Sequence, residues 1–202
     1  MVYDDSDEAP IDANVIELSR QLLYTATGSR VEWHNESLKR TPERFAKMLR
    51  EMTSPENGWE FTTFPNAMEN DQMVVIANIP FVALCEHHIL PFTGQCHIGY
   101  IPGGRLAGLS KFARAVKFWS RGLWTQEDLT DTIAQYLLDM LDPRGLAVVM
   151  SAEHTCMTIR GVQSPGTKTT TSSMKGLYLE NDDHPERIAA AREEFWQHVN
   201  RR

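Results

Sequence analysis

Cysteine is scarce in this sequence, and long apolar segments are missing. Cys85, Cys96 and Cys156 are too few, and odd in number, for the disulfide framework typical of small secreted domains. No apolar run approaches the roughly 20 residues that a membrane-spanning helix requires. The first residues, MVYDDSDEAP, are acidic, whereas a secretory signal begins with basic residues followed by apolar ones. We therefore expect a reduced, cytoplasmic protein that has no membrane partner.

Basic residues are also in deficit, with 20 Lys and Arg against 27 Asp and Glu and a formal net charge of -7. Because nucleic acids attract proteins through surplus positive charge, this balance argues against a nucleic-acid partner. Any anion site must be built locally from a few basic side chains. The 42% hydrophobic and 23% charged residues are ordinary for a soluble globular protein, and the length suits one main domain.

Apolar periodicity and helix terminators predict an α+β fold. Helical spacing is present at 11–27 and 41–52, and the second helix is expected to have Thr41 as its N-cap and Pro42 as its first residue. The other expected elements are strand-like runs at 73–79, 81–90 and 94–101, helices at 110–120 and 126–141, strands at 145–153 and 154–160, a strand or loop at 164–176, and a helix at 185–199. Helices and strands do not alternate strictly, which argues against an all-parallel sheet.

The segment CEHHILPF, which begins at Cys85, carries reactive side chains in an otherwise apolar stretch. Cys85 and His88 are three residues apart, a usual spacing for two metal ligands on one tight segment. If 154–160 is a strand, its period of two places Cys156 on the same face as His154. Two thiolates and one imidazole suit zinc, and three protein ligands leave a fourth position for water, as in a catalytic site. In the alternative interpretation, the cysteines are small buried hydrophobes and the histidines are hydrogen-bonded core residues.

His87 and His88 are adjacent. Neighbouring side chains of a strand-like segment point to opposite faces. We therefore expect one histidine to bind the metal and the other to face a substrate.

Two expected helix starts carry basic residues at helical spacing. Arg44 and Lys47 lie in the first turns of one helix, and Ser110, Lys111 and Arg114 lie at the start of another. A helix N-terminus offers unpaired N–H donors and a positive dipole end, so each start is a candidate phosphate site. The alternative interpretation is an ordinary solvated basic face.

Six segments resemble the GTP cyclohydrolase I family in order and spacing. They are TPERFAKM, CEHHILPFTGQCHIGYIP, GLSKFARAV, QEDLT, HTCMTIRGVQ and TTTSSMKG, and the resemblance covers about residues 38–180. It implies the tunnelling fold, in which antiparallel strands, a helix pair and N-terminal helices assemble so that the strands form an intersubunit barrel. It also implies a homodecamer of two stacked pentamers, with active sites at subunit boundaries.

On this basis we expect an acidic disordered tail at 1–10, an N-terminal helical region at 11–60 and a catalytic domain at 61–202. The implied activity is the zinc-dependent hydrolytic opening of the guanine imidazole ring of GTP at C8, giving 7,8-dihydroneopterin triphosphate and formate. The downstream pathway and any feedback control are not implied.

The resemblance also implies residue roles. Zinc would be bound by Cys85, His88 and Cys156, and protons would be transferred by His87 and His154. Ser110 would take part in the rearrangement of the ribose. The triphosphate would contact Ser110, Lys111, Arg114 and Arg160, together with Arg44 and Lys47 of a neighbouring subunit. The guanine base would be read by Gln126 and Glu127.

The sequence departs from the family pattern in two places: Gly122 follows Arg121 where a second basic residue is usual, and Asp128 replaces an arginine. Cys96 is expected to be a core residue, and His97 has no expected role. Two rival functions remain: a nitrile reductase that shares the fold but uses a cysteine nucleophile and NADPH, and a structural zinc module. A closed shell of four ligands would favour the structural module.

Overall fold

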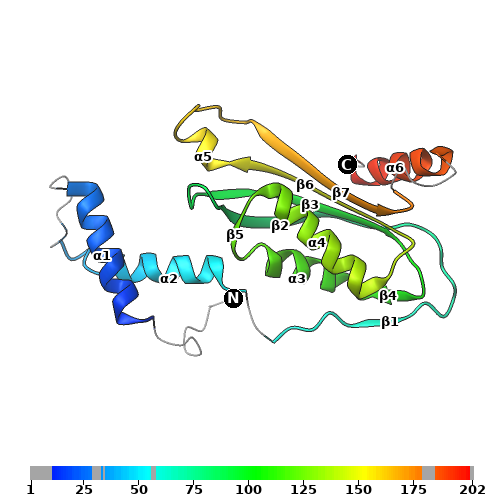
Figure 1. Cartoon of the computed structure of the whole chain (residues 1–202), viewed down its shortest axis with the longest axis horizontal. Helices are drawn as coiled ribbons and strands as arrows, with labels where there is room; N and C mark the ends of the chain where they lie inside the picture. The colour runs from blue at the N-terminus through cyan, green and yellow to red at the C-terminus, as the bar shows by residue number, and fades with distance from the viewer. Residues whose placement is uncertain (1–10, 29–32, 34, 56–57, 179–184, 201–202) are drawn as a thin grey trace. The chain divides into compact units, whose positions relative to one another are not determined.

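The computed structural model describes residues 11–28, 33, 35–55, 58–178 and 185–200 (Figure 1). The tail expected at 1–10 lies outside these residues. The chain divides between Ser54 and Pro55 into two compact units. Within the described residues, no helix has both the length and the apolarity that a bilayer crossing requires.

The N-terminal unit contains helices α1 (Ala13–Thr27) and α2 (Thr41–Thr53). The expected start of α2 is wrong by one residue, because Thr41 is already helical and Arg40 is the N-cap. The Arg40 carbonyl accepts the Arg44 N–H at 3.0 Å, which makes this the first helical hydrogen bond.

The apolar residues that give α1 its helical spacing remain exposed in the described chain. The exposed fractions are 44% for Val15, 64% for Leu18 and 59% for Leu22. One isolated chain therefore leaves an apolar stripe in contact with water, which is typical of a surface that another molecule covers.

The C-terminal unit is built on a five-stranded sheet in the order β5-β2-β3-β6-β7. The strands are β2 (Val74–Cys85), β3 (Pro91–Ile101), β5 (Leu123–Trp124), β6 (Gly145–His154) and β7 (Lys168–Gly176). All neighbours pair antiparallel except β5, which runs parallel to the end of β2. A separate two-stranded sheet pairs β1 (Thr63–Pro65) with β4 (Arg105–Ala107).

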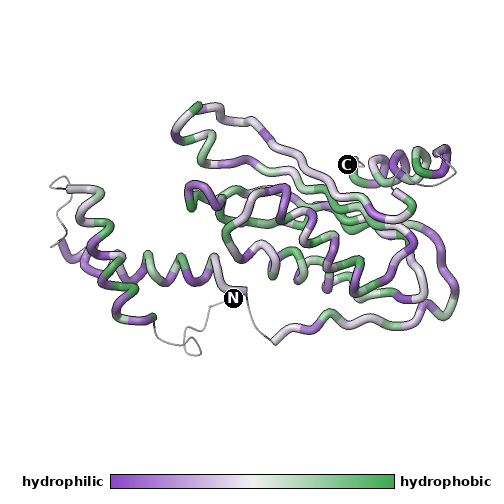
Figure 2. The backbone as a smooth tube through the Cα atoms, viewed as in Figure 1, coloured by the Kyte–Doolittle hydropathy of each residue, from purple (hydrophilic) through white to green (hydrophobic). Residues whose placement is uncertain are grey.

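Helices cover both faces of the five-stranded sheet (Figure 1). On one face α3 (Leu109–Trp119) and α4 (Gln126–Leu141) enclose the main core, which is rich in fully buried leucine, isoleucine and aromatic residues. On the other face α6 (Pro185–Asn200) packs through Phe195 on Tyr178 and β6. Figure 2 shows the apolar residues concentrated along the central strands. The α+β class and the antiparallel pairing predicted from the sequence are therefore present.

Four of the expected strand runs differ from the structure. The runs at 73–79 and 81–90 form one strand, β2, which bulges at Asn78 (φ 60°) and ends at Cys85. The run at 164–176 is a strand only from Lys168. The expected strand at 154–160 is wrong, because β6 ends at His154 and is followed by a helical turn, α5 (Thr155–Thr158).

Candidate active site

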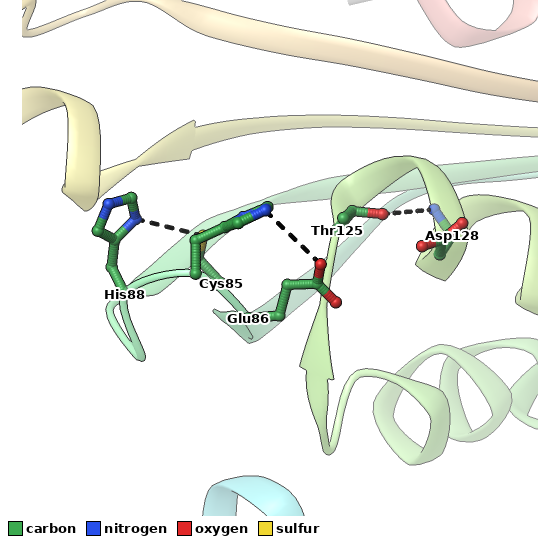
Figure 3. Close-up of polar contacts among 6 residues, drawn as sticks. Cys85, Glu86, His88, Thr125 and Asp128 are labelled. Atoms are coloured by element: carbon green, nitrogen blue, oxygen red, sulfur yellow. Dashed lines mark hydrogen bonds and ion pairs between the residues drawn. The ribbon is translucent and has the colours of Figure 1, made fainter.

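The turn after β2 brings Cys85 and His88 together. The Cys85 carbonyl accepts the Ile89 N–H at 2.8 Å, and the Cys85 N–H donates to the Leu90 carbonyl at 2.9 Å. The chain therefore reverses within a few residues and enters β3 at Pro91. This turn places the Nδ1 atom of His88 3.8 Å from the Cys85 sulfur (Figure 3).

The helical turn α5 supplies Cys156 from the neighbouring part of the sheet. Its first residue, Thr155, donates a hydroxyl hydrogen bond of 2.6 Å to the Pro91 carbonyl, where β3 begins. The Ile159 N–H then closes the turn by donating to the Thr155 carbonyl at 3.1 Å. Because β3 follows the turn that contains His88, this anchor brings the two segments to the same end of the sheet.

The ligand atoms of Cys85, His88 and Cys156 all lie within 4.8 Å of one another. Zinc bonds of about 2.0 Å to nitrogen and about 2.3 Å to sulfur place neighbouring ligand atoms of a tetrahedral site about 3.5–3.8 Å apart. The cluster thus fits a small divalent cation with little movement. Two sulfurs and one imidazole nitrogen favour zinc over magnesium or calcium, which prefer oxygen ligands.

The surroundings of Cys156 favour its protonated thiol as long as no cation is present. Burial and the neighbouring Cys85 raise the pKa of Cys156, whereas the positive charge of Arg160 opposes this shift. A metal ion reverses such a shift because it stabilises the thiolate. Deprotonation of Cys156 should therefore accompany metal binding.

His87 does not point away from the cluster in the way that the sequence predicted. Residues 86–88 form a turn and not a strand, so the period-two argument does not apply. The Nδ1 atom of His87 also lies 3.8 Å from the Cys85 sulfur, while its Nε2 atom lies 3.7 Å from a carboxylate oxygen of Glu86. The His87 side chain is 64% exposed and is therefore accessible to a substrate.

His154, the last residue of β6, is held from two sides. Its ring stacks on Phe92, with centroids 4.5 Å apart and planes 2° from parallel. Its Nε2 atom lies 2.8 Å from the side-chain oxygen of Gln126. Burial lowers the pKa of His154, and the charge of Glu127 opposes this effect. The imidazole is therefore mainly neutral near pH 7.

Gln126 and Glu127 open helix α4 but differ in exposure. Gln126 is 1% exposed, whereas Glu127 is exposed. The side chain of Thr125 caps the helix by accepting the Asp128 N–H at 3.1 Å (Figure 3). Acidic side chains at Glu127 and Asp128 complement the positive end of the helix dipole, which gives the departure at Asp128 a local physical reason.

Gly122 also has a structural reason. A Cβ atom at this position would lie 2.6 Å from Nε1 of Trp124, so any other residue would require the indole ring to move. The indole packs against the main core.

The residues expected to bind phosphate are divided between the two units. Ser110, Lys111 and Arg114 lie in the first turns of α3, and the Lys111 ammonium donates to the Glu60 carbonyl at 2.7 Å. Arg160 follows α5 and is exposed. The two other expected residues, Arg44 and Lys47, belong to α2 of the N-terminal unit.

The sequence indicated no role for Phe92, on which His154 stacks, and none for His97. The Nδ1 atom of His97 accepts the Asn78 N–H at 3.3 Å at the bulge of β2, and burial lowers the pKa of His97. A spacing pattern cannot reveal such a contact, because it depends on strand register. Cys96 is fully buried in the core as expected, and burial raises the pKa of its thiol.

The chain resembles known proteins along most of its length. Residues 18–195 match the family model described as GTP cyclohydrolase I. The GTP cyclohydrolase 1 of Bacillus subtilis (strain 168) is 42% identical over 194 residues, which cover 95% of this chain and 97% of that relative. The enzyme of the same name from Brevibacillus brevis is 40% identical over 189 residues, covering 91% and 95%. A crystal structure of the archaeosine synthase QueF-Like in the apo form aligns with 52% of this chain and 93% of that chain at 15% identity and a TM-score of 0.43, too low to carry an argument.

Proposed function

Because the chain belongs to the GTP cyclohydrolase I family, we propose that it hydrolyses the guanine imidazole ring of GTP at C8. The products are formate and 7,8-dihydroneopterin triphosphate. The observation that carries this proposal is the cluster of Cys85, His88 and Cys156, whose ligand atoms lie within 4.8 Å of one another.

Zinc is the proposed metal of this cluster. When bound, it supplies Lewis acidity, which makes a water molecule nucleophilic near neutral pH. Among the described residues, the cluster contains three side chains that can bind a metal, two cysteines and one histidine. Three protein ligands leave a position for water, whereas a structural zinc site is closed by four.

The proton transfers are assigned to His87 and His154. Ring opening and release of formate break carbon–nitrogen bonds, and each departing nitrogen must gain a proton. His87 is exposed beside the cluster, and His154 is neutral and fixed in orientation. Imidazoles can both accept and donate protons near neutral pH, which suits them to this task.

Substrate binding is assigned to residues around this centre. Ser110, Lys111, Arg114 and Arg160 would bind the triphosphate, with Arg44 and Lys47 added by a neighbouring subunit. Ser110 would also assist the rearrangement of the ribose. Glu127, exposed at the start of α4, would accept the two N–H donors on one edge of guanine.

The proposed assembly is a cytoplasmic homodecamer of two pentamers, in which sheets from several subunits close a barrel. Two observations support association. The sheet is open at both edges, since β7 is terminal and β5 covers only Leu84 and Cys85 of β2. The exposed stripe of Val15, Leu18 and Leu22 on α1 is a second unpartnered surface in the described chain.

The test is to incubate zinc-loaded protein with GTP and to measure formate and, after oxidation, pterin fluorescence. We expect both products in equal amounts, and neither from the Cys156→Ala variant. An assembled, zinc-loaded wild-type protein that releases no formate would contradict the proposal.

A further inference from the structure

The side chain of Gln126 is bound within its own chain. Its Nε2 atom lies 3.0 Å from the Met150 carbonyl, 3.1 Å from the Thr169 carbonyl and 3.1 Å from the Thr171 hydroxyl. Its Oε1 atom lies 2.8 Å from Nε2 of His154. The side chain is buried, so none of these contacts is replaced by water.

These partners fix which end of the amide faces which neighbour. Carbonyl oxygens only accept hydrogen bonds, so the two carbonyls of β6 and β7 require the NH₂ group of Gln126. The reverse orientation would place the Oε1 atom against both carbonyl oxygens. The amide oxygen of Gln126 must therefore face His154.

The amide orientation in turn fixes the tautomer of His154. An amide oxygen is an acceptor, so a 2.8 Å contact requires a hydrogen on Nε2 of the imidazole. In the neutral ring, the other nitrogen, Nδ1, is then the proton acceptor. The stack on Phe92 holds the plane of the same ring.

We propose that Gln126 is a positioning residue for the reaction, which holds His154 in the Nε2–H tautomer with Nδ1 free to accept a proton. This inference rests on the proposed catalytic role of His154. It differs from the role implied by the family resemblance, in which Gln126 reads the guanine base, because a 1% exposed amide with all its polar atoms bound offers nothing to a base.

Further hydrogen bonds hold Gln126 itself. The Thr130 hydroxyl donates to the Gln126 backbone carbonyl at 2.7 Å and lies 2.6 Å from the Thr171 hydroxyl. These contacts attach the start of α4 to β7. Ser173, also on β7, is buried and donates to Asp131 at 2.7 Å, but it contacts neither Gln126 nor His154 among the described hydrogen bonds, so it offers a matched control for the loss of a buried hydrogen bond.

The experiment compares Gln126→Met with Ser173→Ala in the zinc-loaded protein. Gln126→Met keeps the side-chain length but removes the amide, and it should lower kcat about 10–100-fold, by analogy with the hydrogen-bond partners of metal-bound histidines. The KM for GTP, the zinc content and the ratio of kcat/KM for GTP and inosine triphosphate should stay unchanged. Ser173→Ala should lower the unfolding temperature with little effect on kcat.

A double-mutant cycle separates positioning from a general structural effect. If Gln126 acts through His154, the variant carrying both Gln126→Met and His154→Ala should be about as slow as His154→Ala alone.

Additive losses in the cycle would overturn the inference, and so would a raised KM with a changed preference between GTP and inosine triphosphate. A fully active His154→Ala protein would also overturn it, because His154 would then not be catalytic. A wild-type protein that does not act on GTP would instead contradict the proposed function.

Discussion

The imidazole of His154 lies flat on the ring of Phe92, 4.5 Å between centroids and 2° from parallel. The two residues are direct partners across β3 and β6. The stack therefore follows from strand register and gives a fully buried core residue a direct contact with the proposed proton-transfer group.

Phe92→Leu is expected to lower both stability and turnover. The smaller side chain loses packing worth about 1–3 kcal/mol and releases the plane of the His154 ring. Urea unfolding and kcat measure the two effects. Phe112→Leu is the matched control, because Phe112 is fully buried and stacks on Tyr100 instead. If both variants lose the same turnover for the same loss of stability, the stack has no role in the reaction.

Cys85→Ala and Cys156→Ala are each expected to abolish bound zinc and turnover together, since each removes one of three protein ligands. Metal analysis after gel filtration measures this loss. Cys96→Ala, in the core outside the cluster, should keep the metal. Stoichiometric zinc in either ligand variant would refute the assignment.

The two adjacent histidines should separate by metal content. His88→Ala is expected to lose zinc, whereas His87→Ala should keep zinc and lose most of its turnover. Both Nδ1 atoms lie 3.8 Å from the Cys85 sulfur, but among the described residues only His88 joins the group whose ligand atoms also lie within 4.8 Å of Cys156. The reverse pattern of zinc loss would show that the two roles are exchanged.

Acid should weaken the fold through Asp131. Hydrogen bonds from Lys175 and then from Ser173 lower the pKa of this carboxyl group. A lowered folded-state pKa stabilises the protein above the unfolded value of about 3.9, and this contribution disappears as the pH falls through the folded value. Because Asp131 is largely exposed, the contribution should be below about 1 kcal/mol.

Urea unfolding of Asp131→Asn at pH 7 and at pH 3 measures this contribution. The variant should be less stable than wild type at pH 7, and the difference should shrink at pH 3. Asp139→Asn is the control on the same helix, where the carboxylate bonds the neutral Gln135 at 2.9 Å. A difference that stays constant with pH would exclude the ion pair as its cause.

Mixed oligomers test whether Lys47 serves a neighbouring subunit. Cys85→Ala and Lys47→Ala should each be nearly inactive, but refolding them together should restore activity in roughly a quarter of the sites. In those sites, one chain supplies an intact metal centre and the other an intact α2. Parents that are refolded separately and then mixed are the control. Verified mixed oligomers without a gain in activity would show that Lys47 does not act across subunits.

The sequence predicted that Cys85, His88 and Cys156 come together but not the way in which they meet. Two residues three positions apart can meet in any tight turn. The predicted pairing of Cys85 with His88 therefore did not depend on the backbone being a strand. The prediction for Cys156 assumed a strand with a period of two. That strand is absent, because the hydroxyl of Thr155 binds the Pro91 carbonyl and favours a helical turn. A hydrogen bond between residues 64 positions apart leaves no local pattern.

The contact between Gln126 and His154 could not be predicted from the sequence, for a similar reason. It depends on the register of β6 and β7, which places two carbonyl oxygens beside the buried amide. Side-chain hydrogen bonds of this kind are specified by the tertiary fold and not by periodicity.

The two-residue strand β5 sets a length requirement on the chain. Trp124 pairs with Cys85, and its carbonyl accepts the Glu86 N–H at 3.1 Å, while Gln126 begins α4 only two residues later. The segment that carries Cys85 and the segment that carries Gln126 are thus joined at β5. Homologous sequences with the same chemistry should tolerate insertions elsewhere between helices, but not between Trp124 and Gln126, where one added residue would shift one of the two groups relative to the other.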